Sequence, residues 1–354
     1  MFKYILTIIL NITNAQQFEV IKTNEKNETE YPSVNEQQDQ IAVLDLEDFF
    51  SNDEEKQKNF ANQLGNSLHT TGFVLIKNHQ IPQDKIDKVN ESASAFFSLP
   101  LEIKQQYSGV AMNRGYKGFD PERQDKIADL QEYWHVGPIN DLSKLPSQID
   151  IPEIQKNIWP SEIASFESNF SSLYEEIAGK GQPILEACSL YMGKEKTFLS
   201  DLTHHGDSVM RVIHYMPNET QANQTTWKAA HKDPNLLTLI VGISKEGLEI
   251  QTRDGQWVAV PYRPDTIVVS ASNMLENLSN GLIRSAPHRV AIKESKTSRF
   301  SIPFFYHVQR NLSIAPQPES ILKTDGTPHY PDQTAEEALK NHQWFIPTNR
   351  SQNS

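Results

Sequence analysis

The stretch AAHKDPNLLTLIVG, residues 229–242, places two ionisable side chains at the start of an apolar run. The run after Pro234 predicts a buried strand, because short apolar segments bounded by turn residues are typical of strands covered on both faces. His231 and Asp233 are two residues apart, so in an extended chain their side chains point the same way. Pro234 keeps Asp233 extended. An imidazole and a carboxylate that converge at a buried strand predict half of a functional site.

His288, in GLIRSAPHRVAI (residues 281–292), is the candidate for a third ligand. It opens another strand-like run 57 residues after His231 (288 − 231 = 57), which is enough chain for several strands to return beside the first. Two histidines and one carboxylate on one face of a metal form the facial triad of non-haem Fe(II) oxygenases, with the opposite face open for substrate and dioxygen. The absence of cysteine ligands argues against a structural zinc site.

RFSIPFF, residues 299–305, follows eleven residues after His288 (299 − 288 = 11). In a strand, Arg299 and Ser301 share one face. A guanidinium fork beside a hydroxyl is a clamp suited to a carboxylate. Tyr215, in RVIHYMP, offers a further hydroxyl from a separate strand.

Composition limits the classes of partner. The chain has 354 residues and a formal net charge of −12, which argues against nucleic acid or an anionic membrane surface as the main partner. The single cysteine, Cys188, excludes an intramolecular disulfide and is expected in the core. The sequence does not indicate an oligomeric state.

Helical patterns, including a long helical region over about residues 161–192, come before short strand-like runs along the chain. This order predicts a β-sandwich or barrel core with helices packed around it. The predicted divisions are a signal peptide at 1–15, a polar linker at 16–40, a helical and strand region at 41–200, a strand-rich core at 201–312 and a tail at 313–354. The weak signal peptide favours a secreted or periplasmic protein, the alternative being a cytoplasmic one, and its apolar run is too short for a membrane span.

Several segments resemble the isopenicillin N synthase-like family of 2-oxoglutarate/Fe(II)-dependent dioxygenases, over roughly residues 41–310. They are IAVLDLEDFF, TTGFVLIKNHQIP, NRGYKGF with ADLQEYWHVG, the H-x-D strand, the region between the metal ligands, and RFSIPFF. The sequence departs from the family pattern at Gln80, Met216 and Asn273, beside the site rather than in it.

The resemblance implies a double-stranded β-helix (jelly-roll) core with the helical N-terminal half packed around it. It implies Fe(II) on His231, Asp233 and His288, and the distal carboxylate of 2-oxoglutarate on Arg299, Ser301 and Tyr215. It further implies that decarboxylation of 2-oxoglutarate is coupled, with dioxygen, to hydroxylation, desaturation or cyclisation of a small organic substrate.

Substrate contacts are expected from the N-terminal half, with Arg114, Tyr116 and Trp134 as candidates. Two alternatives stay open at this point. One is an Fe(II) oxidase of the isopenicillin N synthase type that does not use 2-oxoglutarate, since such enzymes also carry R-x-S. The other is a ligand-binding protein on the same fold that has lost catalysis.

Overall fold

The computed structural model describes residues 41–108, 114–118, 129–138, 156–217, 226–292 and 296–341, which all lie in one compact unit. The expected signal peptide, the expected linker and the last part of the expected tail, residues 342–354, lie outside the described residues. Within the described ranges, no helix is both long enough and apolar enough to cross a membrane.

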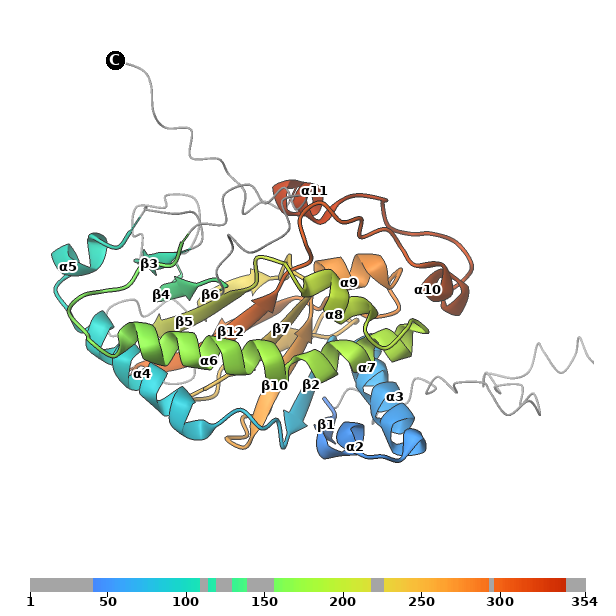
Figure 1. Ribbon diagram of the computed structural model, residues 1–354, viewed down its shortest axis with the longest axis horizontal. Helices are drawn as coiled ribbons and strands as arrows, with labels where there is room; N and C mark the ends of the chain where they lie inside the picture. The colour runs from blue at the N-terminus through green and yellow to red at the C-terminus, as the bar shows by residue number, and fades with distance from the viewer. Residues whose placement is uncertain are drawn as a thin grey trace, which may run out of the picture. The chain divides into compact units, whose positions relative to one another are not determined.

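Two β-sheets form the centre of the described chain (Figure 1). The larger sheet has the strand order β1-β2-β10-β7-β12-β5-β4-β3, and the smaller has the order β6-β11-β8-β9. All strand pairs are antiparallel except β1 with β2. The strands are β1 Val43–Asp45, β2 Phe73–Lys77, β3 Gly115–Lys117, β4 Gln131–Val136, β5 Val209–Tyr215, β6 Thr226–His231, β7 Leu237–Val241, β8 Leu248–Gln251, β9 Trp257–Ala259, β10 Thr266–Ala271, β11 His288–Ala291 and β12 Arg299–Tyr306.

Helices cover one face of the larger sheet, and Figure 1 shows α6 and α7 lying across its strands. Their apolar faces join alternate strand residues in one buried cluster. The helices are α2 Glu47–Phe50, α3 Glu54–Thr70, α4 Gln83–Phe97, α5 Leu101–Gln105, α6 Phe166–Lys180, α7 Gln182–Met192, α8 Phe198–Thr203, α9 Asn273–Leu278, α10 Pro318–Lys323 and α11 Ala335–Asn341. The expectation of a sheet-rich fold with helices is confirmed.

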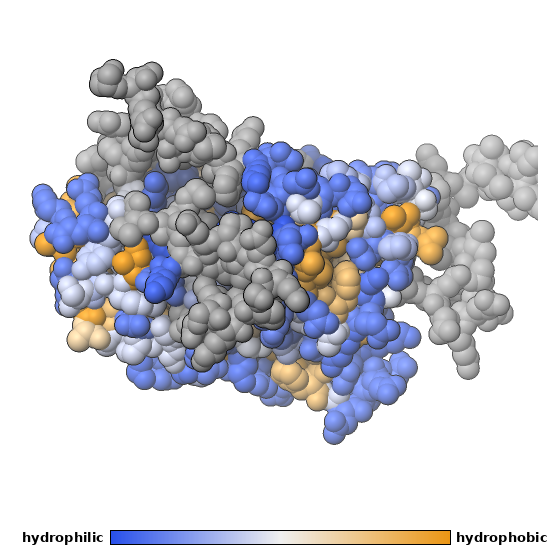
Figure 2. Space-filling view, turned by 45° about the horizontal axis from the view of Figure 1, so that its top comes forward, coloured by the Kyte–Doolittle hydropathy of each residue, from blue (hydrophilic) through white to orange (hydrophobic). Residues whose placement is uncertain are grey.

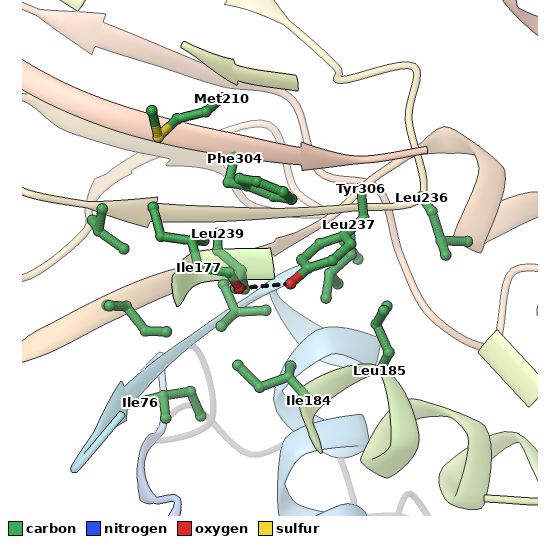
Figure 3. Packing of buried hydrophobic residues seen from close by; sticks show 14 of the residues in the cluster. Ile76, Ile177, Ile184, Leu185, Met210, Leu236, Leu237, Leu239, Phe304 and Tyr306 are labelled. Atoms are coloured by element: carbon green, nitrogen blue, oxygen red, sulfur yellow. Dashed lines mark hydrogen bonds between the residues drawn. The ribbon is translucent and has the colours of Figure 1, made fainter. Parts of the chain in front are cut away.

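Strand β12 shows how the two faces of the larger sheet differ. Ile302, Phe304 and Tyr306 point to the helices, and the Tyr306 hydroxyl donates to the carbonyl of Ile177 at 2.8 Å (Figure 3). Because side chains alternate along a strand, Arg299, Ser301 and Phe305 face the other way. The smaller sheet packs against this second face, as in the cluster that joins Tyr215 and Ile213 to Trp227 and Val290. The predicted site residues on β5 and β12 therefore lie between the two sheets.

The helical region expected over 161–192 is interrupted at Gly181, between α6 and α7. A Cβ atom at Gly181 would lie 2.1 Å from the Tyr306 hydroxyl oxygen. Glycine at this position lets the junction of the two helices approach the sheet closely.

The face of the molecule in Figure 2 is mostly hydrophilic, with small separate hydrophobic patches. Large apolar side chains that are exposed among the described residues are Phe50, Leu101, Tyr262 and Leu322. They come from separate elements, and single exposed apolar residues are ordinary on a protein surface. The chemistry of this chain is therefore best sought between the sheets.

Candidate active site

His231, Asp233 and His288 converge at one end of the smaller sheet. His231 ends β6, His288 begins β11, and the two residues are direct partners in the pairing of these strands. Asp233 lies in the connection from β6 to β7. The Asp233 Oδ1 atom is 3.6 Å from His231 Nε2 and 3.8 Å from His288 Nε2. One ligand atom from each residue lies within 4.8 Å of the others, which is a spacing that one metal ion can bridge.

Hydrogen bonds to neighbouring groups orient these three side chains. His231 Nδ1 donates to the carbonyl of Ala229 at 2.8 Å, and His288 Nδ1 donates to the carbonyl of Ala286 at 3.3 Å. A carbonyl only accepts, so in the neutral imidazole the lone pair is on Nε2, the atom that faces Asp233. The Thr238 hydroxyl donates to Asp233 Oδ2 at 2.8 Å and leaves Oδ1 toward the histidines. Such outer contacts are typical of metal ligands.

The electrostatics of the cluster favour the protonation state that binds a metal. Burial, and then the nearby imidazole of His288, lower the pKa of His231. For Asp233, burial acts to raise the pKa, but the two imidazoles, the Thr238 hydroxyl and the charge of Arg211 together lower it. A neutral His231 imidazole and an ionised Asp233 carboxylate are therefore the dominant forms near neutral pH. Metal binding requires these deprotonated ligands, and this donor set fits Fe(II).

Arg299 is a buried cation with an incomplete set of partners. Its residue is 1% exposed, its Nε donates to the carbonyl of Lys245 at 3.1 Å, and its guanidinium carbon lies 4.8 Å from the centre of the Tyr215 ring. Among the described residues, no acidic side chain pairs with it, and its buried Nη1 atom has no hydrogen-bond partner. A buried charge is stable only when it is paired, so the surroundings of Arg299 suit an anion.

Ser301 and Tyr215 stand beside Arg299, as the sequence predicts. Arg299 and Tyr215 are register partners of β12 and β5, and the Ser301 and Tyr215 hydroxyl oxygens are 3.4 Å apart. The guanidinium and two hydroxyls thus form one polar group on the face toward the smaller sheet. A carboxylate is the ligand that this group suits best.

The three substrate candidates lie in different surroundings. The Arg114 guanidinium pairs with Asp207 at 2.5 Å, with its side chain 1% exposed. The Tyr116 hydroxyl donates to Glu132 at 2.7 Å. Trp134 is fully buried against aromatic rings of the helix-facing core. Tyr116 and Trp134 lie on the helix-facing side of the larger sheet, away from the side toward His231, Asp233 and His288, so as substrate contacts they stay predictions that their positions do not favour.

Sequence reasoning missed four residues near the site: Thr238, Arg211, Tyr133 and His135. Counting back from Tyr215 in steps of two along β5 reaches Arg211, on the same face. His135 is the register partner of Arg211. The alternation of side chains along β5 could therefore have indicated Arg211 as a residue on the same face as Tyr215.

Two histidines and one carboxylate that converge between two sheets are characteristic of mononuclear non-haem iron enzymes. Residues 41–162 match the family model described as the non-haem dioxygenase in morphine synthesis N-terminal region, and residues 206–308 match the 2OG-Fe(II) oxygenase superfamily.

Individual relatives agree with this class. A crystal structure of a 2OG-Fe(II) oxygenase family protein from Caulobacter crescentus is 33% identical, with a TM-score of 0.74, and the match covers 85% of this chain and 97% of that one. The protein DMR6-LIKE OXYGENASE 2 of Arabidopsis thaliana is 28% identical over 296 residues, which are 82% of this chain and 79% of its own. The structure of Neurospora crassa T7H in complex with alpha-KG shares the fold, with a TM-score of 0.76, 23% identity, and coverage of 88% and 98% of the two chains.

The chain belongs to the 2OG-Fe(II) oxygenase superfamily. It is a 2-oxoglutarate/Fe(II)-dependent dioxygenase that uses Fe(II), 2-oxoglutarate and dioxygen to oxidise a small organic substrate.

Proposed function

We propose that His231, Asp233 and His288 hold the Fe(II), and that Arg299, Ser301 and Tyr215 bind the distal carboxylate of 2-oxoglutarate. The observation that carries the proposal is the convergence of three ligand atoms within 4.8 Å in the same space between the sheets as an incompletely partnered buried arginine. Bound Fe(II) supplies the activation of dioxygen that couples decarboxylation of 2-oxoglutarate to substrate oxidation.

The residues of the chain supply position and surroundings. The Ala229 and Ala286 carbonyls hold the two imidazoles in one tautomer, and Thr238 holds the carboxylate, so the ligands need little rearrangement when the metal arrives. Arg299 fixes one end of the cosubstrate, which sets the direction in which its other end reaches the metal. The buried surroundings would keep water away from the metal ion and from the Arg299 guanidinium. Their electrostatic interactions with the cosubstrate would therefore be stronger than in water.

We also propose that the two sheets are the two halves of a double-stranded β-helix. In this assignment residues 201–312 supply the jelly-roll core, and the helices of residues 41–200 pack against the larger sheet. Support comes from the placement of the metal cluster and of Arg299 between the sheets, and from helical residues buried against β7, β10 and β12.

Succinate formation from 2-oxoglutarate tests the assignment of residues. The purified chain with Fe(II) and dioxygen is expected to convert 2-oxoglutarate to succinate, slowly without substrate and faster with it. His231→Ala is expected to lose Fe(II) binding and succinate formation. His329→Ala is the matched control, since His329 is an exposed residue paired with Asp325 and is expected to behave as wild type.

Arg299→Met tests the cosubstrate pocket. It is expected to raise the KM for 2-oxoglutarate by about a hundredfold, because it removes a charged partner of a buried carboxylate. Equal Fe(II) binding by wild type and His231→Ala, or an unchanged KM in Arg299→Met, would contradict the proposed roles.

A further inference from the structure

Arg211 is a second guanidinium on the face of the larger sheet that carries the site. It shares a face of β5 with Tyr215, four residues away, so the two lie about 13 Å apart along the strand. Arg211 therefore lies at a different part of the space between the sheets from Arg299, Ser301 and Tyr215.

Contacts to other side chains hold the Arg211 guanidinium in one orientation. Its carbon atom lies 4.5 Å from the centre of the Tyr133 ring and 5.0 Å from that of Phe305. Its Nε donates to His135 Nε2 at 2.5 Å. His135 accepts only as a neutral imidazole; burial first, and then the charge of Arg211, lower its pKa well below the usual range. The two rings and the imidazole thus fix the plane of the guanidinium.

A short chain of contacts connects Arg211 to the metal cluster. Phe305, whose ring faces the guanidinium, is the register partner of Thr238 on β7. The Thr238 hydroxyl in turn holds Asp233. A molecule bound to Arg211 would therefore lie beside the metal.

Within the described residues, Arg211 differs from Lys228 and Arg114 in having no acidic partner. Lys228 pairs with Asp129 at 2.5 Å, and Arg114 pairs with Asp207. No described carboxylate pairs with Arg211, and no described residue bonds to either of its Nη atoms. The Nε atom is bonded to His135, and the rings of Tyr133 and Phe305 lie against the guanidinium. The edge of the guanidinium that carries the two Nη atoms is therefore the part left for a ligand. A partly buried cation held in this way is best satisfied by a carboxylate that accepts both N–H groups.

We propose that Arg211 is the residue that anchors the substrate, and that the substrate is a small organic acid held through its carboxylate. The rings of Tyr133 and Phe305, together with Ile213 on the same face of β5, would contact its apolar body. The inference rests on the proposed function, because it assigns Arg299 to the cosubstrate and the cluster of His231, Asp233 and His288 to Fe(II).

Calorimetry without dioxygen tests the inference, because binding is then measured without turnover. The full chain with Fe(II) is first titrated with 2-oxoglutarate, which fills the Arg299 end. It is then titrated with matched probes: phenylacetate against phenylacetamide, and hexanoate against hexanamide. We expect the acids to bind at least about tenfold more tightly than their amides, since bonds to a charged group are the stronger ones.

Variants assign the binding to one arginine. Arg211→Met is expected to lower the affinity for the acids at least about tenfold and to leave the affinity for the amides unchanged. Arg211→Lys keeps the charge without the fork and is expected to bind the acids with intermediate affinity. Arg253→Met, on an exposed turn, is the matched control and is expected to bind as wild type. Melting temperatures verify that each variant is folded.

Equal binding of acids and amides would overturn the inference, as would wild-type acid binding by Arg211→Met. Loss of the acid signal in Arg299→Met but not in Arg211→Met would also overturn it, because the probes would then occupy the cosubstrate end. Failure of the proposed function is a separate result: 2-oxoglutarate gives no binding heat in the first titration.

Discussion

At the scale of single residues, the proposed metal site depends on groups other than its three proposed ligands. Thr238 is buried on β7, and its hydroxyl holds the Asp233 oxygen that points away from the histidines. Without this bond, the carboxylate can rotate about its terminal torsion, which has broad energy wells. The direction of Oδ1 is therefore a property of Thr238 as much as of Asp233.

Replacing Thr238 with valine tests this dependence. The shape is nearly conserved while the hydroxyl is lost, so Fe(II) affinity is expected to fall by about ten- to a hundredfold, the range for second partners of metal ligands. Anaerobic titration of Fe(II) gives the dissociation constant. Thr266→Val, at the start of β10, is the control, because its hydroxyl bonds only to the Arg263 carbonyl in the described structure. Unchanged affinity in Thr238→Val would show that Asp233 is oriented by other contacts.

The sequence predicted the residues whose chemistry is local. The shared face of Arg299 and Ser301 follows from the period of strand β12, and the spacing of His231 and Asp233 brings the two together although Asp233 lies in the connection after β6. Thr238 and Arg211 were missed because their roles depend on which strands become neighbours. That pairing is set by contacts between residues far apart in the chain, such as Arg211 with His135.

At the scale of elements, β4 is joined to its neighbours by a buried ionic network on the helix-facing side. Glu132 accepts hydrogen bonds from Lys104 Nζ at 2.8 Å, from the Tyr116 hydroxyl at 2.7 Å and from His214 Nδ1 at 2.8 Å. The His214 ring is stacked on Phe300 of β12. One carboxylate thereby connects α5, β3 and β5 behind the site.

Glu132→Gln is expected to lower the free energy of unfolding by about 3–5 kcal/mol, because it leaves Lys104 buried without its counter-charge. Burial acts to raise the pKa of Glu132, but the bonds from His214, Lys104 and Tyr116 outweigh it, and the pKa is lowered. A lowered carboxyl pKa stabilises the fold above the ordinary glutamate value, and this stabilisation is lost as the pH falls through the lowered pKa.

Urea denaturation at several pH values measures both effects. Wild type is expected to lose more stability than Glu132→Gln on acidification. Glu176→Gln is the matched control, since its partner Lys85 is partly exposed and such pairs contribute only about 0–1 kcal/mol. Equal stability of Glu132→Gln and Glu176→Gln would contradict a structural role for the network.

A tyrosine of β12 connects the end of α6 to the larger sheet. The Tyr306 hydroxyl is within hydrogen-bond distance of the carbonyls of Ile177, at 2.8 Å (Figure 3), and of Ala178, at 2.9 Å, in the last turn of α6. The Ile177 carbonyl also accepts from the Gly181 N–H, and the Ala178 carbonyl from the side-chain amide of Gln182. Tyr306→Phe is expected to cost about 0.5–1.5 kcal/mol in unfolding free energy, the net contribution of a hydrogen bond, because both carbonyls keep a second donor. Hydrogen exchange should show faster opening at the junction of α6 and α7 in this variant, and an unchanged exchange pattern would contradict the role.

This junction also shows where prediction by element was incomplete. Helical spacing over residues 161–192 predicted one long helical region, and both α6 and α7 lie within it. The spacing alone could not reveal the break, because Gly181 is tolerated within a helix. The break falls where Pro183 enters the first turn of α7, because proline has no N–H to bond to the preceding turn. Gly181 beside it leaves room for Tyr306, which comes from a strand more than a hundred residues later.

At the scale of the whole molecule, the larger sheet has two different faces. One packs against helices through apolar side chains, and the other carries Arg211 and Arg299 toward the smaller sheet, whose strands β6 and β11 supply His231 and His288. The order of helices and strands predicted a sheet-rich fold with helices. The strand order across each sheet was not readable from the sequence, because β12 inserts between β7 and β5.

Cys188 reports on the opening of the helix-covered face. It is fully buried on α7, and burial raises the pKa of its thiol to about 12. The thiolate is the nucleophile, so the native chain at pH 8 is expected to react with a disulfide reagent only when α7 separates from the sheet. Fe(II) with 2-oxoglutarate should slow the labelling further, because ligands that bind the native state reduce the unfolded fraction. Rapid labelling of the native chain would contradict this placement.

The same thiol makes stability depend on pH on the alkaline side. Because the pKa of the thiol is raised in the native state, the unfolded chain loses this proton at a lower pH than the native chain does. The stabilisation from the buried thiol is therefore present below the ordinary pKa of 9.0 and is lost as the pH rises from there toward about 12. Cys188→Ala lacks this dependence but loses a buried sulfur. We therefore expect the variant to be less stable than wild type at pH 7, with a smaller further loss at pH 10. Urea denaturation at the two pH values measures the difference, and parallel losses in both proteins would show that the native thiol ionises as it does in water.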